Sequence, residues 1–124
     1  MNKEFIPYEE ALAMKELGFD EFTVAAYVDN ELDVGGLWKD SVKSKVIHKA
    51  PLFQQAFRWF RDKYNLVFNF ISYSIVKPGE YHWSITWNDE AKAGGIVKTY
   101  EEAELACLKK LIEIVNQNKE DEKR

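Results

Sequence analysis

The chain has 124 residues with a net charge of −4, and 46% of them are hydrophobic and 15% aromatic. Such a chain can bury enough apolar surface for one core, which excludes a globally disordered protein. Runs of about 18 apolar residues do not occur, so a membrane-spanning helix is excluded. Acidic residues interrupt the first ten positions, and we therefore expect no export signal and a cytoplasmic location.

Charge is spread unevenly along the chain. Residues 1–33 hold nine acidic residues and two lysines, a balance of −7. Residues 38–63 hold seven basic and two acidic residues, a balance of +5. This segregation predicts either pairing between the two segments or two distinct surfaces.

The first third of the chain predicts a helix followed by a hairpin. Pro7 suits the first turn of a helix over residues 7–17, and Gly18 is a natural stop. Residues 22–34 are rich in strand-forming residues around a turn at Asp29-Asn30, and we expect Gly35-Gly36 to close this hairpin. The lysine-rich connector 37–49 has no readable pattern.

A helix begins after Pro51, because apolar residues recur at helical spacing as far as Tyr64. Asn65 is a suitable left-handed residue at its C-terminal end. A second helix, over residues 100–116, begins with a capping box in which Thr99 and Glu102 each bond the backbone N–H of the other. The six charged residues of the tail, 119–124, are expected to fray.

Between these helices the period of apolar residues changes to two, which predicts strands at 66–76, 81–87 and 96–97. Turn residues lie at 77–80, and we expect a loop over 88–95. On the first strand the residues that we expect to face the helices are Val67, Ile71, Tyr73 and Ile75. On the second strand these residues are Tyr81, Trp83, Ile85 and Trp87.

The predicted fold class is α+β. A small antiparallel sheet, a three-stranded meander in α-β-β-β-α order, has helices on one face, and an N-terminal helix–hairpin extension precedes it. We expect one domain, with residues 1–49 packing on a core of residues 50–118 that ends in the charged tail.

Three segments resemble a family of small uncharacterised proteins from bacteriophages, prophages and gut bacteria. They are IPYEEALAMKELGFDE (6–21), APLFQQAFRWFRDKYNL (50–66) and TYEEAELACLKKLIEIV (99–115). The resemblance implies no activity, cofactor or catalytic residue, but it favours an accessory role in a phage or its host. The element order also looks like that of double-stranded RNA-binding domains. Those domains have lysines at the start of the last helix, whereas this chain has Glu101, Glu102 and Glu104 there, which would repel phosphates.

No catalytic, cofactor or metal site is predicted. His48 and His82 lie 34 residues apart without acids or cysteines at ligand spacing, and the paired glutamates 9–10 and 101–102 suit the first turns of helices. Cys107 lies in a helical apolar pattern, which indicates a buried structural thiol. We therefore expect a protein that is not an enzyme.

The leading hypothesis is a non-enzymatic module that binds or regulates another protein, such as a host protein. The candidate partner face is the serine-rich side of the sheet, which either lies exposed or is covered by residues 1–35. Its predicted residues are Phe68, Phe70, Ser72, His82 and Ser84.

The competing hypothesis is nucleic-acid binding through a basic surface. The predicted contacts are Lys39, Lys43, Lys45, Lys49, Arg58 and Arg61. The alternative for these cations is a solvated surface neutralised by the acidic first third of the chain. The oligomeric state stays open, because an exposed edge strand at Ile96-Val97 would permit dimerisation.

Overall fold

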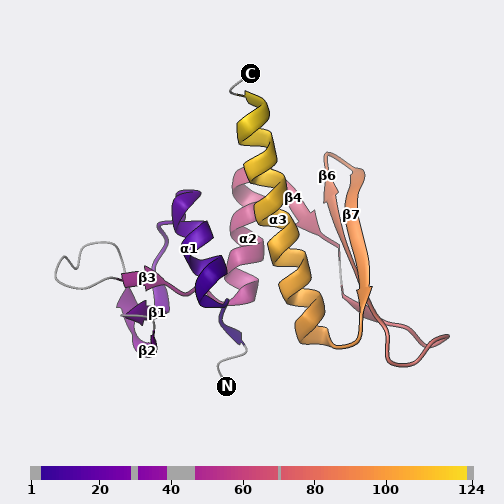
Figure 1. The fold of residues 1–124 in the computed structure, drawn as a ribbon, viewed down its shortest axis with the longest axis horizontal. Coiled ribbons are helices and arrows are strands. Elements are labelled where there is room, and N and C mark those ends of the chain that lie inside the picture. The colour runs from indigo at the N-terminus through magenta and orange to yellow at the C-terminus, as the bar shows by residue number, and fades with distance from the viewer. Residues whose placement is uncertain (1–3, 29–30, 39–46, 70, 123–124) are drawn as a thin grey trace. The chain divides into compact units, whose positions relative to one another are not determined.

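The computed structural model describes residues 4–28, 31–38, 47–69 and 71–122 (Figure 1). The protein has the predicted α+β class, with helices and antiparallel sheets. It divides into two compact units, residues 1–56 and 57–124, whose boundary falls inside a helix, α2 (Phe53–Tyr64). The predicted domain boundaries at residues 49 and 118 stay a prediction. No helix in the described ranges is long and apolar enough to cross a bilayer.

The first unit contains the predicted helix and hairpin. Its elements are α1 (Tyr8–Glu16), β1 (Thr23–Val28), β2 (Glu31–Trp38) and β3 (Ile47–Lys49). The strands form an antiparallel sheet in the order β2-β1-β3. The short β3 strand was not predicted, because it lies at the end of the lysine-rich connector and is specified by its pairing with β1.

The prediction that Gly35-Gly36 closes the hairpin is wrong. The β2 strand continues through both glycines to Trp38, which lies opposite Thr23. The pairing shifts by two residues in this stretch, since Ala25 lies opposite Val34. Glycines inside a strand commonly mark such an irregularity, and here the strand continues through them.

The core of the first unit combines α1 with its sheet. Tyr8 makes edge-to-face ring contacts with Tyr27 and His48, each with a centroid separation of 5.5 Å, and the Tyr27 hydroxyl donates a hydrogen bond of 2.9 Å to the Ile6 carbonyl. The buried apolar residues of this unit include Ile6, Ala11, Met14, Leu17, Phe19, Ala25 and Ala26. The helix predicted over residues 7–17 is confirmed as α1.

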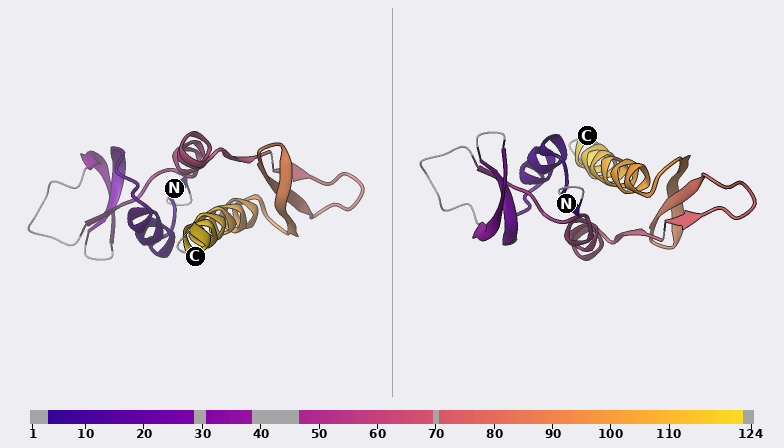
Figure 2. Two further views of the ribbon diagram at one scale, coloured as in Figure 1. Left: turned by 90° about the horizontal axis from the view of Figure 1, so that it is seen from above. Right: turned by 90° about the horizontal axis from the view of Figure 1, so that it is seen from below.

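The second unit contains the rest of α2, a sheet and a long closing helix. Its remaining elements are β4 (Leu66–Phe68), β5 (Ser72–Tyr73), β6 (Tyr81–Trp87), β7 (Glu90–Val97) and α3 (Tyr100–Glu122). β6 is the central strand, with β7 on one side and with β4 and β5 following each other on the other side. Both α2 and α3 lie on one side of this sheet (Figure 2). The predicted meander and the position of its helices are therefore confirmed.

The strand predicted over residues 66–76 is interrupted, and this changes which side chains face the helices. Phe68 lies opposite Ile85, whereas Ser72 lies opposite His82, so one extra residue is inserted between β4 and β5. The prediction that Ile75 is buried is wrong, because its side chain is 89% exposed beyond the end of β5.

The loop predicted over residues 88–95 is also wrong. Asn88 and Asp89, with φ angles of 51° and 65°, form a tight turn, and β7 pairs with β6 along its whole length. Positive φ at both central residues is the requirement of a type I′ hairpin turn, which Asn and Asp tolerate. Only the end of this strand, Ile96-Val97, was predicted.

The closing helix begins as predicted. The Thr99 hydroxyl accepts a hydrogen bond of 3.1 Å from the Glu102 N–H, while the Glu102 carboxylate accepts one of 3.3 Å from the Lys98 N–H, one residue earlier than in a capping box. The prediction that the tail from residue 119 frays is wrong as far as Glu122, since α3 extends to this residue. Asn65 has the predicted left-handed conformation, with a φ of 57°.

Candidate functional site

The outer face is the side of the β4–β7 sheet opposite α2 and α3, and it carries the candidate site. Side chains alternate along β6, and Ile85, which faces the helices, is fully buried. His82 and Ser84 lie on the outer face, where cross-strand pairing adds Ser72, Ile96 and Gly94. The predicted partner residues Ser72, His82 and Ser84 therefore share one face, although their role stays a prediction.

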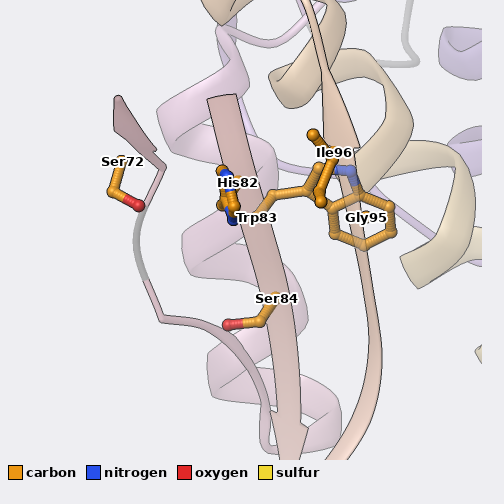
Figure 3. Close-up of a pocket in the computed structure, with 6 residues that line it drawn as sticks. All are labelled: Ser72, His82, Trp83, Ser84, Gly95 and Ile96. Atoms are coloured by element: carbon orange, nitrogen blue, oxygen red, sulfur yellow. The ribbon is translucent and has the colours of Figure 1, made fainter. Parts of the chain in front are cut away.

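These residues surround an open hollow of about 450 Å³ (Figure 3). Its lining residues are Ser72, His82, Trp83, Ser84, Gly95 and Ile96. Ile96 is 59% exposed, so its apolar side chain is open to contact at the border of the hollow. The hollow thus offers small hydroxyl groups, one imidazole and one apolar contact to a binding partner.

Asn69 fixes the position of the hydroxyl groups beside the hollow. Its side-chain amide donates hydrogen bonds to Ser84 Oγ at 3.0 Å and to Thr86 Oγ1 at 2.7 Å, and its backbone N–H donates to the Ser84 carbonyl at 3.0 Å. Because both hydroxyl oxygens accept these bonds, their own O–H groups can donate to another molecule. Asn69 was not singled out from the sequence, since nothing in the pattern indicated the interruption that it stabilises.

His82 is held beside an acidic side chain. Its Nε2 lies 3.4 Å from Glu80 Oε1, a contact that becomes an ion pair when the imidazole is protonated. The Nε2 atom is shielded from solvent and makes no hydrogen bond within the described part of the chain, but 44% of the side chain is exposed. The predicted location of this histidine, partly exposed on the open face of the sheet, is confirmed.

Trp83 also lines the hollow, although its indole lies on the other side of the sheet. Its indole leaves β6 on the side opposite Ser84 and crosses Gly95 of β7 (Figure 3). A Cβ atom at Gly95 would lie only 2.7 Å from Trp83 Nε1, so this position admits only glycine unless the indole moves. The buried indole N–H has no hydrogen-bond partner among the described residues.

Phe68 was predicted on the serine-rich face, and this placement is wrong. Its ring lies against Phe57 of α2, with centroids 4.4 Å apart, and Phe68 pairs with the buried Ile85. The residue inserted before Ser72 reverses the alternation, which explains why Phe68 and Ser72 lie on opposite faces despite their even spacing. Phe70, the other predicted aromatic residue, lies outside the described residues.

The residues of the predicted basic surface lie in different environments in the structure. Lys49 is only 4% exposed, with its ammonium group 5.5 Å from the Phe19 ring centroid, so its prediction as a surface contact is wrong. The Lys49 side chain is buried in the first unit, where β3 pairs with β1. Arg58 and Arg61 of α2 are exposed. The remaining predicted contacts, Lys39, Lys43 and Lys45, lie outside the described residues.

A second hollow, of about 240 Å³, lies beside Trp87 at the end of β6. Its cations already have partners: the Lys92 ammonium is 5.0 Å from the Trp87 ring centroid, and the Lys110 ammonium is 3.1 Å from Glu113 Oε1. The mixed charge of this surface gives no preference for phosphate groups.

The remaining reactive side chains are buried separately from one another. Cys107 is fully buried on α3, where burial and then the Glu104 carboxylate raise its pKa to about 12. His48 is nearly buried in β3, and its pKa is lowered first by burial and then by Lys15. In the described ranges, no group of three histidine, cysteine or acidic side chains is placed to hold a metal ion.

Comparison with known proteins gave no match, since no protein-family model, curated protein or solved structure is significantly similar to the chain. The resemblance of residues 6–21, 50–66 and 99–115 to bacteriophage and gut-bacterial proteins therefore stays a prediction.

Proposed function

We propose that this protein is a non-enzymatic protein-binding module and that its binding surface is the outer face of the β4–β7 sheet. The observation that carries the proposal is the hollow bounded by Ser72, His82, Ser84 and Ile96. An accessory role in a bacteriophage or its host rests on the sequence resemblance alone, and the cytoplasmic location rests on the acidic residues within the first ten positions.

The chemistry of the hollow favours one kind of partner. The hydroxyl groups donate hydrogen bonds, and the exposed Ile96 side chain offers apolar contact. A protein segment that presents backbone carbonyl groups beside one apolar side chain complements both features. The wide opening of the hollow also suits a segment laid across the sheet better than an enclosed small molecule.

Ser84→Arg tests this surface. The arginine side chain fills the hollow, while Asn69 keeps its hydrogen bond to Thr86, so the sheet is expected to stay folded. We expect the tagged wild-type protein to capture a partner from its native cells. The purified partner should then bind Ser84→Arg at least tenfold more weakly in calorimetry.

Asn116→Arg, on an exposed position of α3, is the matched control because it adds the same charge away from the sheet. This variant should bind the partner like the wild type, and circular dichroism should show native helix content in both variants. Equal affinity of the wild type and folded Ser84→Arg for the partner would contradict the proposed surface.

A further inference from the structure

His48 lies in the contact between α1 and the sheet of the first unit. It is directly opposite Tyr27 in the pairing of β3 with β1, so both side chains leave the same face of this sheet. The Tyr8 ring of α1 contacts both of them, at a centroid separation of 5.5 Å from each. The imidazole is therefore one of the groups on which α1 packs.

The contact accommodates a neutral imidazole but not an imidazolium ion. His48 is only 9% exposed, and its Nδ1 atom is shielded from solvent without a hydrogen bond in the described part of the chain. A charge in this position would lose its water without gaining a partner, whereas a neutral ring loses much less. Burial accordingly lowers the pKa of His48, and the Lys15 ammonium lowers it further.

The other groups of this contact do not offer the imidazolium a negative partner. On α1, Lys15 repels a second positive charge, while the Glu10 carboxylate acts on Tyr27, whose pKa is raised first by burial and then by Glu10. Tyr8 contacts His48 through its ring, and the Tyr27 hydroxyl already donates a hydrogen bond to a backbone carbonyl. Protonation of His48 would thus bury an unpaired charge beside a like charge.

We propose that the contact between α1 and β3 is a pH-sensitive element of the fold, which is closed over neutral His48 and opens locally when mildly acidic solvent protonates this residue. Opening exposes the imidazole to water, and it also exposes Ala11 and Met14 of α1, which are buried in the closed unit. This inference goes beyond the proposed function and does not depend on it, since the outer face lies in the second unit.

The direction of the effect follows from proton linkage. The opened unit binds a proton at the ordinary histidine pKa of about 6.5, whereas the closed contact binds it only at lower pH. Acid therefore favours the opened form. Between pH 7.5 and pH 5.5 its population should rise by up to about tenfold, the factor for a histidine that stays neutral in the closed form.

NMR of the full chain tests the proposal by hydrogen exchange and by titration of the imidazole. We expect the protection factors of amides in α1 and β3, corrected for intrinsic exchange rates, to fall by up to about tenfold from pH 7.5 to pH 5.5. His48→Phe keeps a ring beside Tyr8 but takes up no proton, so its protection factors should fall less. Of the two histidine signals in the wild type, the one missing from this variant should titrate below pH 6.5.

A charge variant tests the contribution of Lys15. Lys15→Gln removes the repulsion that the imidazolium meets, so the loss of protection between the two pH values should be smaller than in the wild type. Lys109→Gln makes the same charge change at an exposed position of α3 and is the matched control. This control should show the wild-type pH dependence.

A His48 signal that titrates at or above pH 6.5 would overturn the proposal. So would an equal pH dependence of exchange in the wild type and in folded His48→Phe, because other titrating groups would then cause the opening. The titration of the wild type keeps the test valid if His48→Phe does not fold.

Discussion

At the scale of single residues, Trp83 and Gly95 act as one packing unit. The indole lies where a Cβ at Gly95 would be, at 2.7 Å from Nε1 and 2.9 Å from Cε2. We expect Gly95→Ala to displace the indole and to lower the free energy of unfolding by about 1–3 kcal/mol. Thermal denaturation with circular dichroism measures this loss.

A double-mutant cycle identifies the cause of the loss. Trp83→Phe replaces the indole by a smaller ring, so the cost of adding Gly95→Ala should fall in that background. If Gly95→Ala costs the same free energy with tryptophan and with phenylalanine at position 83, the loss arises from the backbone and this packing argument fails.

At the scale of elements, the turn between β6 and β7 determines whether residues 90–97 form a strand. Asp89 has a φ of 65°, a conformation that glycine adopts without strain and alanine does not. We therefore expect Asp89→Gly to raise the free energy of unfolding by about 0.5 kcal/mol and Asp89→Ala to lower it by about 1 kcal/mol. Urea denaturation of the two variants measures both changes, and a more stable Asp89→Ala would contradict the type I′ turn.

Elements with strong local signals could be predicted from the sequence. The helical spacing of apolar residues before Tyr64, the left-handed Asn65 and the Thr99–Glu102 cap all depend on neighbours within a few positions. β3 and the continuation of β2 through Gly35-Gly36 could not be predicted, because the pairing of each strand with β1 is specified by contacts between different segments of the chain.

The position of the candidate site residues was predicted only in part, because their alternation is a local signal that fails where a strand is interrupted. The alternation on β6 placed His82 and Ser84 correctly, since nothing interrupts that strand. Phe68 was misplaced because a one-residue insertion before Ser72 leaves no trace in the apolar pattern. The positions of Ile96 and Gly94 on the outer face were not predicted, because residues 88–95 were expected to form a loop. Asn88-Asp89 was the available signal, as a two-residue turn between alternating segments.

At the scale of the whole molecule, tyrosine and cysteine side chains in both units make stability depend on pH in the alkaline range. Burial raises the pKa of Tyr27 in the first unit, and of Tyr64 and Tyr100 in the second. Burial, and then the Glu104 carboxylate, raise the pKa of Cys107 from 9.0 to about 12. Each folded group keeps its proton at a pH where the unfolded chain has lost it, so unfolding releases protons and stability falls as pH rises.

Between pH 7 and pH 9 these four groups leave the free energy of unfolding unchanged, and above pH 9 they should lower it. Cys107 alone contributes a loss of about 1.4 kcal/mol for each pH unit between 9 and 12. Thermal denaturation from pH 7 to pH 11 measures the decrease, and Cys107→Ala is the control, because removing the thiol should make the slope shallower. The tyrosines keep their contribution in that variant, so a residual decrease should remain above pH 10. Identical slopes for the wild type and Cys107→Ala would show that the thiol is accessible to solvent in the folded protein, in conflict with its buried position on α3.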